Sequence, residues 1–238
     1  MMRQHTRLVG WSLAMLAIAL FCTLGTWQLQ RKLGKEALLA QAGSAMASAP
    51  VGLAAALDGP PRLQRVQGHG RFLAAQVLLD NQLREGRAGI RVYQPFLAEG
   101  GNHWVLVDLG WLPMPADRRV PAVAPVSGEH ELSGLLAPAP AAGVAMGESM
   151  QATGADTWLA VRLDFPRIAR ELQVPGPMSG QVLRLDPDIA LGHARDLAML
   201  PNTLPPARHL GYAVQWFGLA IAVLVIAVLL EWRQRRRR

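Results

Sequence analysis

The sequence predicts an α+β membrane protein in which two transmembrane helices flank a small β-rich soluble domain with one or two short helices. Two stretches without Asp, Glu, Lys or Arg lie at residues 8–30 and 209–230. Each is long enough to cross a bilayer as a helix, which takes about 20 residues. In residues 31–208, apolar residues alternate with polar ones in several short runs, which predicts an antiparallel barrel or a sandwich-like fold.

The chain begins with a short tail, residues 1–7, before the first span. We interpret the span as an uncleaved anchor, because its apolar run exceeds the about 7–15 residues of a signal peptide and no small-x-small site directly follows it. Beyond it, Leu29, Leu33 and Ala37 recur at four-residue steps and predict that the helix continues past the headgroups.

A connector rich in Ala, Gly, Ser and Pro is predicted over residues 43–61. Its short apolar run at 53–57 forms either a one-turn helix or a packed loop. Strands are predicted at residues 66–72, 77–83, 90–97, 104–111, 131–136, 158–163 and 182–185, with the first four as an antiparallel meander. Loose gaps are expected at 113–126 and 137–154, and Pro166 predicts a short helix at 166–172.

Most of the net charge of +7 lies in the two tails, above all in the basic tail at residues 231–238. By the positive-inside rule both termini are expected in the cytoplasm and the central domain in the periplasm, although Arg31, Lys32 and Lys35 lie on the opposing side. The short N-terminal tail leaves no room for a transit peptide, which favours a bacterial inner membrane. Charge confined to the tails favours contact with membrane lipids and argues against nucleic acid.

Catalytic chemistry is sparse in the soluble part, so we predict that the protein is not an enzyme. The sole cysteine, Cys22, falls inside the first span, so the outer domain is expected to have no disulfide. The domain's histidines are scattered without ligand spacing: His69, His103, His130 and His193. Its acidic residues are expected at the surface, in strands and turns, among them Asp80, Asp108, Asp156 and Asp164.

The more specific signal lies at the outer membrane boundary. His209, Tyr212 and Trp216 are spaced i, i+3 and i+7, which places them on one face of the second span, and Trp27 ends the first span at the same depth. An imidazole flanked by aromatic rings suits axial ligation of a haem iron. The alternative is an anchoring belt, because Trp and Tyr gather at membrane interfaces without any ligand.

Small residues in both spans follow the small-xxx-small pattern that lets membrane helices approach closely. The pairs are Gly10 with Ala14 and Gly218 with Ala222. They predict that the two spans pack on each other or on a partner.

Several segments together resemble the surfeit locus protein one family, in the same order over nearly the whole chain. At the membrane boundary they are Gly25-Thr26-Trp27-Gln28 with Arg31 and Lys35, and residues 208–217, R-H-L-G-Y-A-V-Q-W-F. In the domain they are residues 89–96, G-I-R-V-Y-Q-P-F, the turn at 110–113, and the strand at 158–164.

The resemblance implies an assembly factor for the haem-copper terminal oxidase, cytochrome c oxidase, which holds or positions haem a for insertion into the catalytic subunit. The partners that the resemblance implies are that subunit and the haem a synthesis enzymes. It also implies His209 as the candidate iron ligand and Trp27 as the matching tryptophan. Arg31 and Lys35 would either fix the helix at headgroup depth or pair with a haem propionate. The chain departs from the family at Leu109, where the family often has arginine.

Two other functions remain open from the sequence. One is a haem-independent scaffold that organises oxidase subunits. The other is a membrane-tethered small-molecule sensor or envelope enzyme, which a buried cluster of acidic residues or histidines in the domain would favour.

Overall fold

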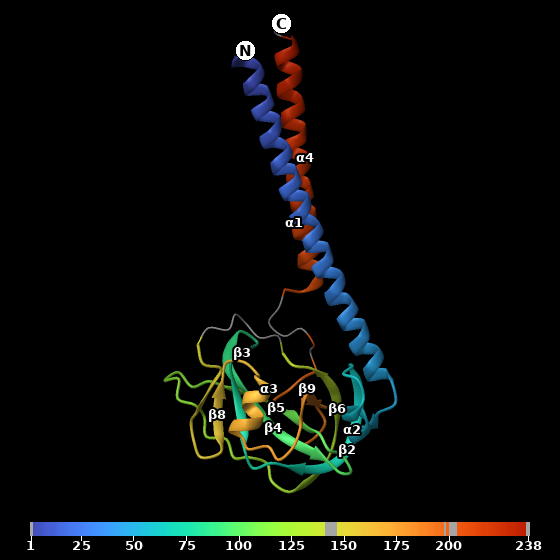
Figure 1. Ribbon diagram of the computed structural model, residues 1–238, viewed down its shortest axis with the longest axis vertical. Helices are drawn as coiled ribbons and strands as arrows, with labels where there is room; N and C mark the ends of the chain where they lie inside the picture. Colours follow the sequence, from blue (N-terminus) through green and yellow to red (C-terminus); the bar gives the residue numbers. More distant parts are fainter. Residues whose placement is uncertain (1, 141–146, 198, 200–203, 237–238) are drawn as a thin grey trace. The chain divides into compact units, whose positions relative to one another are not determined.

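Two long helices and a β-rich domain make up the structure, a computed structural model that describes residues 2–140, 147–197, 199 and 204–236 (Figure 1). The chain divides into a helical unit, Met1–Ala40 with Thr203–Arg238, and a domain, Gln41–Asn202. Part of the expected gap at 137–154, residues 141–146, and the end of the basic tail, Arg237 and Arg238, lie outside the described residues.

The long helices are α1 (Met2–Ala47) and α4 (Pro206–Arg236). Both are long and apolar enough to cross a membrane, and only 6% and 11% of their most apolar windows are buried, unlike the core helix of a soluble protein. Both predicted spans are therefore confirmed as apolar helices. The predicted continuation of the first helix is also confirmed, since α1 runs without a break to Ala47.

Within the helical unit, α1 and α4 pack side by side in antiparallel directions (Figure 1). The face of α4 that meets α1 carries alanine at every seventh position: Ala213 and Ala220 are buried and Ala227 is half-buried. Such small residues allow close packing of membrane helices. A seven-residue repeat keeps one seam facing the partner helix along several turns.

Close approach between the helices is concentrated at Gly25. A Cβ added there would lie 2.8–3.0 Å from ring atoms of Phe217, so the ring occupies the space that a side chain would need. The close approach that the sequence predicts at Gly10 and Gly218 is not found, because a Cβ at either position would meet nothing within 4 Å among the described residues.

The domain contains one nine-stranded sheet in the order β1-β2-β6-β9-β5-β4-β3-β8-β7, with an additional pairing of β2 with β4. The strands are β1 (Val51–Gly52), β2 (Gln64–Phe72), β3 (Gln76–Arg84), β4 (Arg87–Ala98), β5 (Trp104–Pro113), β6 (Glu129–Pro138), β7 (Met150–Ala152), β8 (Thr157–Ala160) and β9 (Met178–Leu185). The extra pairing folds the sheet back on itself, while β3, β8 and β7 continue beyond it. The domain is sandwich-like, one of the two arrangements that the sequence predicts.

The strand pairing corrects two further expectations. The sheet is mixed, because β1 runs parallel to β2, β8 parallel to β3, and β9 parallel to β5. The antiparallel meander covers only β3, β4 and β5, since β2 pairs with β6 and β4. In addition, β7 lies within the segment expected to be a loose gap.

Two short helices cover the two apolar layers of the domain. The run at 53–57 is helical, as one alternative predicted: α2 (Leu53–Asp58) buries Leu53 and Leu57 in the larger core cluster. The predicted helix at 166–172 is confirmed as α3 (Phe165–Glu171), which buries Ile168 in the second cluster. The Asp164 side chain caps α3 by accepting a hydrogen bond from the Arg167 backbone N–H at 3.3 Å.

Candidate functional site on the helix pair

His209 lies in the first turns of α4 and faces α1, with only 7% of its surface exposed. Its Nδ1 is 2.7 Å from Oε1 of Gln28 on α1. Since the amide oxygen can only accept, Nδ1 carries the proton and the Nε2 atom of a neutral ring keeps its lone pair. The contact therefore fixes both the orientation and the tautomer of the imidazole.

The second ring nitrogen of His209 has no bonding partner among the residues that the structure describes. Nε2 is buried and accepts no hydrogen bond from any part of the chain that the structure describes. Buried polar atoms are normally paired, and an unpaired one costs about 1–3 kcal/mol. An oriented imidazole with an unused Nε2 has the chemistry of an axial ligand to haem iron.

The predicted aromatic residues divide between the seam and the outer surface of the helix pair. Trp216 stacks on Phe21 of α1, with ring centroids 5.7 Å apart and planes inclined by 28°. Tyr212 and Trp27 are 40% and 47% exposed. The structure thus brings His209 and Trp216 to the seam and leaves the other two on the outside of the pair.

Two cations of α1 lie within two turns of Gln28. The Arg31 guanidinium lies 5.6 Å from the ring centroid of Trp27, in a cation–π contact. The Lys35 ammonium donates to the carbonyl of Leu204, just before α4 begins. Both residues keep a positive charge close to the end of the seam that carries His209.

In the domain, a buried polar cluster spans three neighbouring strands. Tyr93 on β4, Asp108 on β5 and Arg184 on β9 stand in register. The Arg91 guanidinium donates to Asp108 at 2.6 Å, and Asp108 is only 3% exposed. The expected surface position of Asp108 was therefore wrong: the register places it inside, where the pair with Arg91 offsets the loss of hydration.

Burial and neighbouring charges shift the pKa values of this cluster. Burial is the largest single effect on Arg91 and lowers its pKa, but Asp108, Tyr93 and Asp196 together outweigh it and leave the pKa raised. For Arg184, burial dominates and the pKa is lowered. Burial, reinforced by the negative charge of Asp108, raises the pKa of Tyr93 well above its usual range, and its hydroxyl has no partner among the described residues.

The histidines of the domain lie apart from one another, as the sequence predicts. His69 faces Glu99, and His103 lies 2.8 Å from Asp58. Within the described ranges, no group of three or more His, Cys, Asp or Glu residues could hold a metal ion. The buried cluster around Asp108 holds one carboxylate among arginines, so it differs from the acidic or histidine cluster that would favour a sensor or enzyme.

Leu109, where the resemblance noted from the sequence implies arginine, is buried in the larger core cluster. Its backbone carbonyl accepts a hydrogen bond from the His193 N–H at 2.7 Å. In this chain the position is therefore part of the apolar packing.

Sequence reasoning assigned no role to Gln28 or Phe21, which provide the contacts on α1. Both lie on a seven-residue repeat that continues to Lys35. That repeat, with the matching alanine repeat on α4, is the signal that predicts the seam.

Comparisons with known proteins agree over most of the chain. The sequence model of the SURF1 family matches residues 15–221. A SURF1-like protein of Rickettsia conorii is 25% identical over 235 residues, covering 93% of this chain and 90% of the relative. A SURF1-like protein of Rickettsia felis is 24% identical over 227 residues, covering 90% and 93%.

Proposed function

Because this chain belongs to the SURF1 family, which is generally linked to cytochrome oxidase assembly, we propose that it is a non-catalytic assembly factor that holds or positions haem a for insertion into the oxidase's catalytic subunit. The observation that carries the haem role is the imidazole of His209. Its Nδ1 is held by Gln28, and its Nε2 has no bonding partner within the described part of the chain. In this role haem a is the cargo, and the helix pair supplies the ligand and the apolar surface.

The residues around His209 fit such a cargo in kind. The apolar helices would bury the macrocycle and its hydrocarbon tail, which supplies most of the affinity. The iron bond to Nε2 would set the orientation. The aromatic ring of Trp216 offers a flat surface about two turns further along α4.

Arg31 and Lys35 have two candidate roles in this proposal. As cations near the ligand, they would pair with the haem propionates through charge-assisted hydrogen bonds. As residues at the end of an apolar span, they would fix α1 at headgroup depth. The Arg31 contact with Trp27 is compatible with both roles.

Loading requires a local opening of the seam. Nε2 is enclosed in this structure, so the imidazole or the side chains that cover it must move before an iron can bind. A haem that must be passed on suits a site in which the seam between the helices can close again after the haem has left. The opening also predicts that binding depends on how tightly the two helices pack.

We place the chain in the bacterial inner membrane, with both termini in the cytoplasm and the domain in the periplasm. The support is the basic end of α4, where Arg233, Arg235 and Arg236 lie in the last turn. Alkaline phosphatase fused after Gly100 should be active, and the same enzyme fused at either terminus inactive. The reverse pattern would overturn this topology.

The haem role is tested by co-expressing the full chain with haem a synthesis enzymes and recording visible spectra of the purified protein. We expect haem to copurify with the wild type and with the control His103→Ala, whose imidazole lies in the domain. The variant His209→Ala should lose the haem absorption. Equal haem content in His209→Ala and wild type would refute ligation by this residue.

A haem-independent scaffold is the second candidate, and the enclosure of Nε2 favours it. In that case the contact of His209 with Gln28 serves only to lock the helices together. The scaffold predicts that no preparation contains haem and that His209→Ala still pulls down the catalytic subunit of the oxidase. The same samples therefore separate the two candidates.

A further inference from the structure

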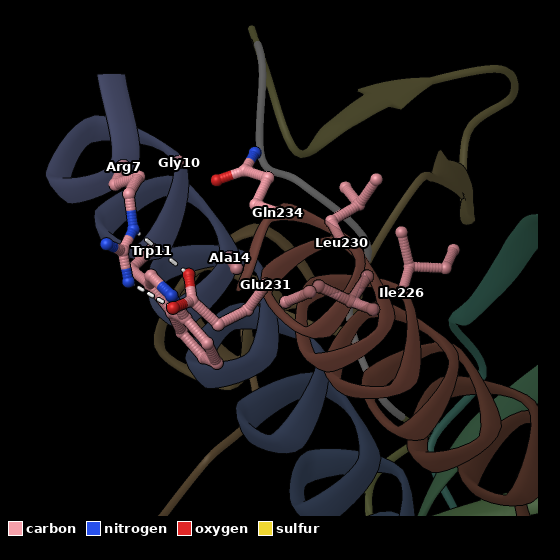
Figure 2. Close-up of a pocket in the computed structure, with 10 residues that line it drawn as sticks. Arg7, Gly10, Trp11, Ala14, Ile226, Leu230, Glu231 and Gln234 are labelled. Atoms are coloured by element: carbon pink, nitrogen blue, oxygen red, sulfur yellow. Dashed lines mark hydrogen bonds and ion pairs between the residues drawn. The ribbon is translucent and has the colours of Figure 1, made fainter. Parts of the chain in front are cut away.

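A groove of about 230 Å³ lies between α1 and α4 at the end that carries the two chain termini, far along both helices from His209. Figure 2 shows its floor and walls, formed by small and apolar side chains of both helices. The principal ones are Gly10, Trp11, Ala14, Ile226, Ala227 and Leu230. The small residues leave the space, because a Cβ at Gly10 would meet nothing within 4 Å.

The rim of the groove is polar and positively charged. Arg7 reaches across from α1 and binds Glu231 of α4 through both carboxylate oxygens (Figure 2). The same carboxylate accepts a hydrogen bond from Arg235 at 2.9 Å, so two guanidiniums share one negative charge. The amide of Gln234 lines this rim as a further donor.

We propose that this groove binds one anionic phospholipid of the leaflet that contains the chain termini. The phosphate would meet Arg7 and Arg235 at the rim, and an acyl chain would lie over Gly10 and Ala14. The charge matches, since the rim has one guanidinium more than Glu231 neutralises and anionic lipids are attracted to such basic segments.

The dimensions favour a lipid chain over another helix. A whole α-helix with side chains is about 10–12 Å across and cannot enter a groove of about 230 Å³, so a second copy of the chain would fill it only with single side chains. The gradient from the charged rim at Arg7 to the apolar wall at Ile226 also matches a molecule with a polar head and an apolar tail. A second copy of the chain is the main competing occupant.

The test uses the full-length protein in nanodiscs of equimolar phosphatidylglycerol and phosphatidylcholine, followed by native mass spectrometry of the released protein. We expect phosphatidylglycerol to be retained about fivefold over phosphatidylcholine, as one net charge near the membrane surface predicts. Equal retention of the two lipids would overturn the proposal, because it indicates ordinary boundary lipid.

Three variants separate head and tail recognition. Arg7→Gln should lower the preference for phosphatidylglycerol, whereas Glu231→Gln should raise it, although both remove the same ion pair. Gly10→Leu fills the groove and should abolish retention of either lipid. Val9→Leu, next to it but outside the groove and 58% exposed, is the matched control and should behave as wild type.

Each contrary result counts against the lipid. If Arg7→Gln and Glu231→Gln change retention in the same direction, the ion pair acts only in packing. If Gly10→Leu retains lipid, the groove is not the site. If wild type forms dimers without lipid and Gly10→Leu is monomeric, the groove belongs to a second copy.

Discussion

The side chains of Gln28 and His209, 181 positions apart in the chain, meet at 2.7 Å across the seam of the helix pair. In an apolar environment this contact satisfies one ring nitrogen and leaves the other available. It therefore links the packing of the two spans to the chemistry of the candidate ligand.

Replacing Gln28 by alanine should weaken haem binding without abolishing it. The ligand His209 remains, but its tautomer and orientation are no longer fixed. Loss of such a supporting contact typically lowers metal affinity about 10–100-fold. Haem titration of the purified protein measures the change. Gln30→Ala, an exposed glutamine on the same helix, should have no effect, and an equal loss in both variants would contradict a positioning role.

The variant Gly25→Ala should destabilise the helix pair by about 1–3 kcal/mol, because its Cβ would collide with the ring of Phe217. Adding Phe217→Ala should relieve the collision, so the double variant shows non-additive energies in a double-mutant cycle. Unfolding in detergent micelles measures the stabilities. Gly34→Ala, with open space around it, should be neutral or stabilising by up to about 1 kcal/mol. Equal effects at both glycines would count against close packing at Gly25.

Asp108→Ala should destabilise the domain by about 3–5 kcal/mol, because it leaves the buried guanidinium of Arg91 without its counter-ion. Urea unfolding of the full chain, followed by tryptophan fluorescence, measures the free energy of unfolding. Asp117→Ala removes an exposed pair with Arg119 and should change it by less than about 0.5 kcal/mol. Similar losses in the two variants would show that the buried ion pair contributes no more to the free energy of unfolding than the exposed one.

The Tyr93 hydroxyl should make the domain sensitive to alkaline pH. Burial raises its pKa above the unfolded value of about 10, so the folded state holds this proton more tightly. The stabilisation is complete below pH of about 10 and is lost as pH rises towards the folded pKa. Unfolding curves at increasing pH should therefore be flatter for Tyr93→Phe than for wild type.

At neutral pH, Tyr93→Phe should be as stable as wild type or more stable by about 1–3 kcal/mol, because it removes a buried hydroxyl that has no partner in the described ranges. A clear loss of stability at neutral pH would mean that the hydroxyl has a bonding partner in solution.

Local sequence patterns predicted the elements well and their arrangement less well. Alternation located the strands from β2 to β6, although only β2 alternates clearly in burial and most residues of β4 and β5 are buried on both faces. It could not show that β9 inserts between β5 and β6, since pairing between strands far apart in the chain depends on the packing of the whole domain. The parallel pairs in this sheet are long-range contacts of this kind.

The candidate site was predicted in part for a similar reason. The spacing of His209 and Trp216 placed both on one helix face, and both meet α1. Tyr212 lies outside the seam. From His209 the buried face of α4 advances by four residues to Ala213 and then by three to Trp216, so position 212 falls beside this face. The burial of Asp108 depends on strand register, which no local pattern around it indicates.

The helix pair carries a polar contact near each end, Gln28 with His209 and Arg7 with Glu231. Small or apolar residues fill the seam between these two contacts. Because the alanines of α4 recur every seven residues, the apolar packing would be nearly the same if one helix shifted by seven residues along the other. The terminal contacts forbid that slippage, because both would break at once. The apolar residues between the two polar contacts should therefore tolerate substitution by other apolar residues, while the two contacts determine the register of one helix against the other.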